Sequence, residues 1–357
     1  MVRLNTNRKK EIALKRFRFF YQEIVWAFIL IFIFLLIPIF LIPLIVEEGT
    51  PIYGILFYSI RALFVMLGIP LIYPLSNLIF ESQKRNLIIR EDVSPAIGHL
   101  RLYKMTKKNY KYQLLYGILI FFLVFLPIDF FNYLLIPKMI EYQSFSLAFN
   151  STNAYLLSSV YNVFLISAII IQFSVAIAEE SISRGLLTKR GSEHFFSISA
   201  VIISTLYWGL GHFAYFLDPI SRVYPIWYPL LWFLQAFVIG IILSLIVVRR
   251  KWLFPVIIAH AINNIISAHV VWSFFQGISF TLLAIYVYFP LLIIGFCLLV
   301  WFFPLIKEGV STGLKMLSEY FKKDQSIEKT KGDAIFRVFI DIIMGFLIFI
   351  VGFIIAV

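Results

Sequence analysis

The sequence has little charge and almost no cysteine. Asp, Glu, Lys and Arg make up 14% of its 357 residues, and Cys297 is the single cysteine. One cysteine excludes an intrachain disulfide and a metal site built from cysteines. The HExxH pattern of many zinc peptidases is absent, and so is GxGD, which argues against an aspartyl hydrolase. In contrast, 61% of the residues are hydrophobic, which is more than a soluble domain can bury.

Long hydrophobic runs dominate the chain and predict an all-α, polytopic membrane protein. A helix needs about 20 apolar residues to cross the hydrocarbon core of a bilayer. We predict a bundle of nine spans, although an eight-span core with one added helix at the end would give a similar pattern. The first run has no cleavage-site pattern and is expected to be a signal anchor. The predicted spans are Ile24–Val46, Ile52–Phe80, Gln113–Ile136, Ala154–Ala178, Phe196–Leu217, Ile226–Val248, Trp252–Phe274, Ile278–Ile306 and Ala334–Val357.

The Lys and Arg residues lie unevenly between these spans. All but three of the 31 fall in segments that alternate onto one side of the membrane, the exceptions being Arg61, Lys138 and Arg222. Since positive loops stay in the cytoplasm, we expect a cytoplasmic N-terminus and an external C-terminus. The net charge of +12 is thus explained by topology, and no nucleic-acid partner is expected.

Two pairs of ionisable residues inside the spans suggest structural contacts. Arg61 and Asp129 lie on the second and third predicted helices, and we expect them to form an ion pair. Arg337 and Asp341 are four residues apart on the last helix, so they share a face and are expected to pair with each other.

A second set of polar residues is arranged differently, at intervals of four residues on three separate spans. Residues at this spacing share one face of a helix. Ionisable groups within membrane spans are usually functional, because they are costly there. We therefore expect three short polar stripes to face one another. They are Glu179, Glu180 and Arg184 in "EESISR", Trp208 and His212 in "WGLGH", and His260 and Asn264 in "HAINN".

These three elements, in this order, resemble the CPBP family of intramembrane proteases. That family includes the Rce1-type CAAX prenyl endopeptidases and the Abi bacteriocin-immunity proteins, and its pattern is E-E-x-x-x-R, then F-x-x-x-H, then H-x-x-x-N or D. Trp208 replaces the usual phenylalanine, and the polar "SIS" at 181–183 replaces residues that are bulky and apolar in many members. The resemblance covers about residues 154–272.

The resemblance implies an endopeptidase that hydrolyses peptide bonds with an activated water. It implies that Glu179 is the base, acting with His212, and that His260 and Asn264 stabilise the oxyanion. Glu180 then pairs with Arg184, although the roles of the two glutamates could be exchanged. Trp208 and Arg184 are supporting residues.

The resemblance also divides the chain into three parts. Residues 1–153 carry helices 1–3 with the basic tail and a cytoplasmic loop, and residues 154–274 form the catalytic core of helices 4–7. Residues 275–357 carry the C-terminal helices. They include segment 307–333, whose apolar residues recur at helical spacing, as in an amphipathic helix lying on the cytoplasmic membrane face.

Several alternatives remain at this point. No cofactor is favoured, but a zinc ion held by Glu179, His212 and His260 would use the same residues. The expected partners are membrane lipids and a peptide or lipidated-protein substrate, with a prenylated CAAX C-terminus as one candidate. We expect the plasma membrane of a prokaryote, with the site opening to the cytoplasm. The competing functions are a non-catalytic scaffold or immunity-like protein and a proton-coupled transporter.

Overall fold

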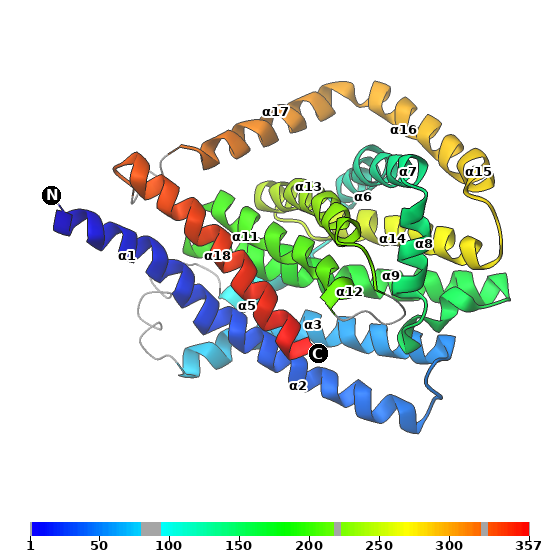
Figure 1. The fold of residues 1–357 in the computed structure, drawn as a ribbon. Coiled ribbons are helices and arrows are strands. Elements are labelled where there is room, and N and C mark those ends of the chain that lie inside the picture. The colour runs from blue at the N-terminus through cyan, green and yellow to red at the C-terminus, as the bar shows by residue number, and fades with distance from the viewer. Residues whose placement is uncertain (1, 80–93, 218–222, 323–327, 357) are drawn as a thin grey trace.

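A computed structural model describes residues 2–79, 94–217, 223–322 and 328–356 (Figure 1). In these ranges the regular structure is entirely helical, without strands, and nine helices are long and apolar enough to cross a membrane. The all-α fold with nine spans is therefore confirmed. The spans are Arg8–Leu44, Pro51–Ser76, Tyr110–Leu135, Tyr161–His194, Ser197–Leu217, Trp227–Arg250, Phe254–Phe275, Phe280–Trp301 and Lys331–Ile355.

The helices follow one another with short connections, and several are continued by a π-helical or 3-10 segment. The first span joins α1 (Val2–Phe19), η1 (Phe20–Ile24) and α2 (Val25–Leu41), so the basic tail is itself helical. The remaining elements are η2 (Ile42–Leu44), α3 (Pro51–Ile79), α5 (Pro95–Arg101), α6 (Tyr110–Ile120), η4 (Phe121–Phe125), α7 (Leu126–Leu135), α8 (Lys138–Leu147), η5 (Ser151–Leu157), α9 (Tyr161–Glu180), η6 (Ser181–Arg190), α10 (Gly191–His194), α11 (Ser197–Leu210), η7 (Gly211–Phe213), α12 (Ala214–Leu217), α13 (Trp227–Arg250), α14 (Phe254–Phe275), α15 (Phe280–Leu283), η8 (Ala284–Tyr288), α16 (Phe289–Trp301), α17 (Phe303–Tyr320) and α18 (Lys331–Ala356).

The fourth span differs most from its predicted limits. Its predicted start, Ala154, lies in the 3-10 segment η5, and α9 begins only at Tyr161. At its other end the helix continues as η6 to Arg190. Both glutamates of "EESISR" therefore lie within a long helix rather than at its end. The predicted span began too early because it took in residues 154–157 (AYLL), the apolar end of η5.

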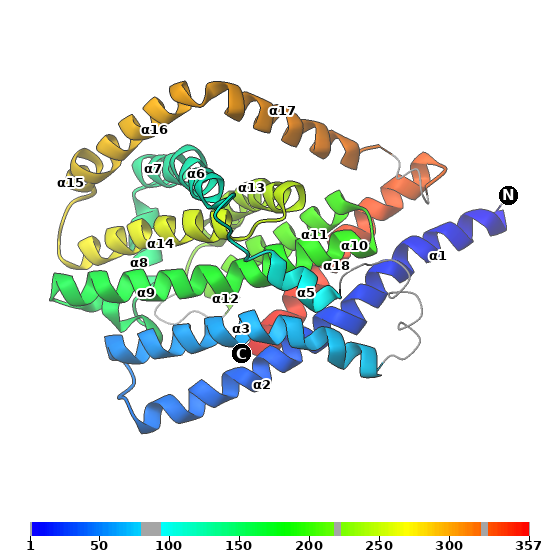
Figure 2. The ribbon, with the colours of Figure 1, turned by 180° about the vertical axis from the view of Figure 1, so that it is seen from behind.

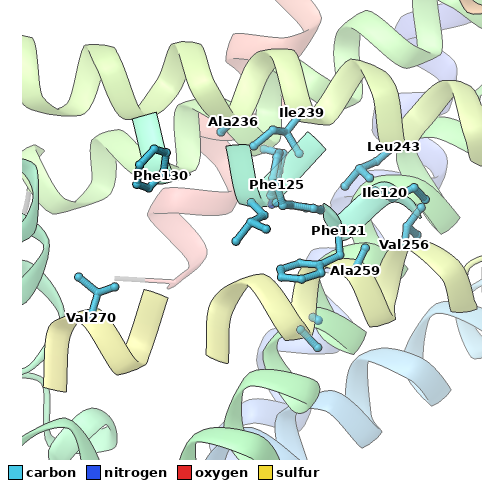
Figure 3. Close-up of a cluster of buried hydrophobic side chains, with 14 of the residues drawn as sticks. Ile120, Phe121, Phe125, Phe130, Ala236, Ile239, Leu243, Val256, Ala259 and Val270 are labelled. Carbon is cyan, nitrogen blue, oxygen red and sulfur yellow. The ribbon is translucent and has the colours of Figure 1, made fainter. Parts of the chain in front are cut away.

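Helix α14 lies at the centre of the bundle. In its most apolar stretch 61% of the residues are buried, against 22% in the span Phe280–Trp301. It packs on α9, α6 and α8, while α11 packs on α13, η6 and α18. Figure 3 shows the apolar cluster between these helices, with Phe121 and Phe125 from η4 meeting Ile239 and Ala259. This cluster gives the polar residues nearby a rigid support.

The last span belongs to the bundle. Helix α18 packs on α11 and lies beside α1, as Figures 1 and 2 both show. A Cβ atom at Gly345 would lie 2.7 Å from the Cβ of Leu206, so the glycine allows this close approach. Helix α18 thus lies between α1 and α11, the helix that carries most of "WGLGH".

The predicted Arg337–Asp341 pair is wrong, although the two residues do share a face. Asp341 accepts a hydrogen bond from Arg16 Nε at 2.5 Å and another from the hydroxyl of Tyr320 at 3.1 Å. Arg337 donates to Glu328 Oε1 at 2.6 Å. Each of the two side chains therefore pairs with a residue of another segment, and they do not pair with each other.

The predicted amphipathic segment at 307–333 is helical from Phe303 to Tyr320, and its residues 323–327 lie outside the described ranges. Phe80 and Val357, the predicted ends of two spans, also lie outside them. The side of the membrane that each terminus faces, and the division at 153 and 274, stay predictions.

Candidate active site

Glu180 is enclosed by two basic side chains. Its side chain is fully buried, and Arg184 NH1 donates to its Oε1 at 3.2 Å, as the four-residue spacing predicted. His260 Nδ1 lies 2.8 Å from the same oxygen. Because a carboxylate only accepts, Nδ1 must carry the proton. Glu180 thus holds both Arg184 and His260 in place.

Arg184 reaches a third helix through Trp208. Its guanidinium carbon lies 4.2 Å from the centre of the Trp208 ring, which is a cation–π contact between η6 and α11. Gly240 on α13 faces this contact. A side chain larger than hydrogen at this position would press on both groups.

Gly240→Ala is expected to lower stability. The added Cβ would lie 2.9 Å from Thr205 Cγ2 and 3.2 Å from Trp208 Cε3, so the neighbours must shift. Overpacking of this kind costs about 1–3 kcal/mol. Thermal unfolding in detergent checks the result against Gly309→Ala, whose Cβ has nothing within 4 Å. A melting temperature that falls equally in both variants, or in neither, would contradict the close packing described.

Glu179 has a different environment from Glu180. Trp208 Nε1 donates to its Oε2 at 2.8 Å, and His260 Nε2 lies 3.9 Å from the same oxygen. Its side chain keeps 35% of its exposure, while that of Glu180 keeps none. The reason is that Glu179 faces a cavity.

That cavity has a volume of about 230 Å³ and brings the predicted residues of all three helices together. Glu179, Trp208, His212, His260 and Asn264 line it, whereas Glu180 and Arg184 lie behind its wall. A second cavity of about 270 Å³, between α3, α9, α11 and α18, is also lined by Glu179, Trp208 and His212. Glu179 and His212 are therefore reached from two sides.

His212 lies in the 3-10 turn η7, just after α11 ends. Its Nδ1 is 3.2 Å from the carbonyl oxygen of Gly209, to which it must donate, so Nε2 is left as an acceptor. The ring packs against Trp232, with centroids 4.7 Å apart. The break in the helix turns the imidazole towards the cavity.

Arg61 and Asp129 were expected to pair, and this prediction is wrong. No ion pair joins them in the described part of the chain. Asp129 accepts from Ser267 Oγ at 2.7 Å, and both Asp129 and Arg61 line the smaller cavity. The signal that could have placed them there was their polarity within spans, which we assigned to packing instead.

Two histidines outside the predicted spans, His99 and His194, are part of the folded structure. His194 Nε2 lies 2.9 Å from Glu23 Oε1. His99 is in the short helix α5 and is buried against Gly185, where an added Cβ would lie 2.6 Å from its Cε1. Burial lowers the pKa of His99 from 6.5 to about 4. His99 is therefore neutral at physiological pH.

The linings of the two cavities bear on how the site is reached. They come from the spans and from the segment between the third and fourth spans, which includes Gln143 and Asn153. No residue of the segments 94–112 or 249–251 contributes. The predicted opening to the cytoplasm gains no support from these linings and stays a prediction.

The zinc alternative does not fit the side chains as they are arranged. Among the described residues, no three His, Cys, Asp or Glu side chains are grouped closely enough to hold a metal ion. The Nδ1 of His260 is hydrogen-bonded to Glu180, and His212 makes no ion pair with Glu179 within 4.0 Å. Zinc binding would require these side chains to move.

Comparison with known proteins gives one result that bears on this site. Residues 161–266 match the family model described as type II CAAX prenyl endopeptidase Rce1-like. No curated protein and no solved structure matches the chain. The matched residues include Glu179, His212, His260 and Asn264. Over residues 161–266, the chain is therefore similar to the Rce1-like type II CAAX prenyl endopeptidase family.

Proposed function

We propose that the chain is an intramembrane endopeptidase that hydrolyses peptide bonds of membrane-associated substrates with a water activated by Glu179. The observation that carries this proposal is the contrast between the two glutamates. Glu180 is closed off by Arg184 and His260, while Glu179 is open to a cavity and is held by the indole of Trp208. Only Glu179 has room for a water beside its carboxylate, which favours it as the base.

In the proposed reaction, Glu179 and His212 hold the attacking water between them. The Nε2 of His212 accepts one hydrogen of the water, because its Nδ1 proton is donated to Gly209. Glu179 takes the other proton as the water oxygen bonds to the carbonyl carbon of the substrate. When the C–N bond breaks, this proton passes to the leaving nitrogen. The products are a new carboxyl group and a new amine.

Asn264 and His260 are placed to stabilise the oxyanion that forms on the carbonyl oxygen. The carboxamide of Asn264 lines the cavity and makes no hydrogen bond to the described residues, so its N–H groups are free to donate. His260 donates its Nδ1 proton in a hydrogen bond to Glu180. Its Nε2 therefore carries a proton, and can donate, only in the imidazolium form. Phe125 and Trp208 hold its ring from two sides, with centroids 5.9 Å and 5.5 Å away.

The proposed substrates are peptides attached to the membrane, among them prenylated CAAX C-termini, as the family description suggests. Such a substrate can place its lipid among the spans while its peptide reaches Glu179. Entry from the cytoplasm rests on the charge asymmetry alone. The proposed catalytic part is residues 154–274, with the flanking helices as support.

Asn264→Ala is expected to lower kcat by about 10²- to 10³-fold with little change in KM, since loss of one oxyanion donor has effects of this size. Cleavage of a farnesylated CAAX peptide by the purified protein in detergent gives both constants. Asn109→Ala is the matched control, because Asn109 lies outside the spans, before α6. A kcat that stays within about twofold of wild type would exclude Asn264 from the reaction.

A further inference from the structure

Arg61 lies in an unusual position for an arginine. It is in α3, about 15 Å along the helix from Pro51 at about 1.5 Å per residue, and thus well inside the second span. It lines both cavities described above. Residues shared by the two linings are Arg61, Glu179, Trp208, His212 and Tyr215. Arg61 is therefore in the wall where the proposed reaction takes place.

The fully buried arginines of the described residues have carboxylate partners, whereas Arg61, which lines the cavities, has none. Each of the four buried arginines contacts an acidic side chain: Arg16 with Asp341, Arg184 with Glu180, Arg190 with Glu23 and Arg337 with Glu328. Within the described residues, Arg61 makes no hydrogen bond and no ion pair within 4.0 Å. A cation in a membrane span is costly unless a partner compensates it, so the position of Arg61 in the cavity wall suits an anionic ligand.

Glu179 is not an ion-pair partner of Arg61. The charges of Arg61 and Glu179 are close enough to interact, but the two side chains are beyond ion-pair distance. The Oε2 of Glu179 instead accepts a hydrogen bond from Trp208 Nε1. The guanidinium of Arg61 keeps its donors free in the cavity. A guanidinium fork matches a carboxylate with two parallel hydrogen bonds, which is its preferred geometry.

The size of the cavities favours the end of a chain over a continuous segment. Their volumes of about 230 and 270 Å³ are below the roughly 300–1,000 Å³ of typical ligand pockets. A short C-terminal fragment carries its own carboxylate into such a space. A polypeptide that continues for many residues beyond the scissile bond would need more room.

We propose that Arg61 forms a carboxylate-binding subsite that receives the C-terminal carboxylate of the substrate, with the scissile bond beside Glu179. This inference rests on the proposed peptidase function. It makes Arg61 a residue that determines specificity for peptides with a free C-terminus, rather than one that only balances the charge of Glu179.

The test compares two farnesylated CAAX peptides that differ only in ending as a free acid or as an amide. The wild type is expected to cleave the acid about 10- to 100-fold better in kcat/KM, mainly through KM, because hydrogen bonds to charged groups contribute strongly. Arg61→Gln removes this preference, while Arg61→Lys keeps part of it. Arg249→Gln, which breaks an exposed pair with Glu308, leaves the preference unchanged.

Binding of the same two peptides separates failure of this inference from failure of the proposed function. If the wild type cleaves neither peptide, the Kd values for acid and amide, measured for wild type and Arg61→Gln, still decide the matter. Tighter binding of the acid that is lost in Arg61→Gln supports the subsite. Equal binding of acid and amide by the wild type overturns it. So does an Arg61→Gln variant that loses cleavage of both peptides equally, because charge balance alone explains that result.

A third peptide tests whether the carboxylate must be the chain end. It ends as an amide and has aspartate as its last residue. Binding much weaker than that of the free acid supports recognition of the C-terminus. Binding as tight as that of the free acid overturns this part of the inference, since a side-chain carboxylate then suffices.

Discussion

Glu179→Gln should lower kcat for peptide cleavage by about 10²- to 10⁴-fold, the usual contribution of a general base. The amide keeps the size of the carboxylate and can still accept from Trp208, but it cannot take a proton from water. Since the side chain faces a cavity, the fold should remain intact. The measurement is the cleavage rate of a farnesylated CAAX peptide by the purified variant, together with its melting temperature.

Glu308→Gln is the matched control for this experiment. Glu308 is an exposed glutamate on α17 that pairs with Arg249. It is not among the residues that line the cavity. It should cleave at the wild-type rate. A Glu179→Gln variant that retains a rate near wild type would remove Glu179 from the chemistry.

Glu180→Ala should act on stability instead. Its removal leaves the guanidinium of Arg184 fully buried without its carboxylate, and leaves His260 without the acceptor for its Nδ1 proton. Breaking one partner of a buried ion pair costs about 3–5 kcal/mol. Thermal unfolding in detergent should therefore show a large drop in melting temperature, much larger than that of Glu179→Ala.

A double-mutant cycle separates this effect from simple loss of packing. Replacing Arg184 by Met as well removes the uncompensated charge, so Glu180→Ala with Arg184→Met should be more stable than Glu180→Ala alone. If the double variant is less stable than the wild type by the sum of the two single effects, the pair does not interact as described. If Glu180→Ala is stable and inactive while Glu179→Ala is unstable, the roles of the two glutamates are exchanged.

The sequence was sufficient for the architecture because each span is a local property. A run of about 20 apolar residues predicts a membrane helix without knowledge of its neighbours. The nine spans are confirmed for this reason. The limits of the fourth span were predicted less well, because the apolar end of the 3-10 segment, residues 154–157, lies shortly before the helix that begins at Tyr161.

Pairing between side chains depends on tertiary structure and was harder to predict. The Glu180–Arg184 pair was found because both residues lie on one face of one helix. The same argument failed for Arg337 and Asp341, since Glu328 and Arg16 compete for them from other segments. Arg61 and Asp129 lie on different helices, and no pattern in the sequence fixes how those helices are rotated.

The motif residues came together, but their unequal environments could not be predicted. Adjacent residues on a helix point about 100° apart, so one of two neighbouring glutamates can be enclosed while the other faces a cavity. Which one is enclosed depends on where α14 places His260 and where α11 places Trp208. The sequence identifies the residues, and only the packing of the helices distinguishes Glu179 from Glu180.

Cleavage of a farnesylated CAAX peptide by the wild-type protein in proteoliposomes, followed by mass spectrometry with and without a chelator, tests the central claim most directly. We expect one cut that releases a short C-terminal fragment, at a rate that the chelator does not change. Loss of cleavage with the chelator, restored by zinc, would contradict water activation by Glu179 and would make His212 and His260 metal ligands. No cleavage of this or any other membrane peptide by well-folded protein would contradict the peptidase itself and favour a scaffold.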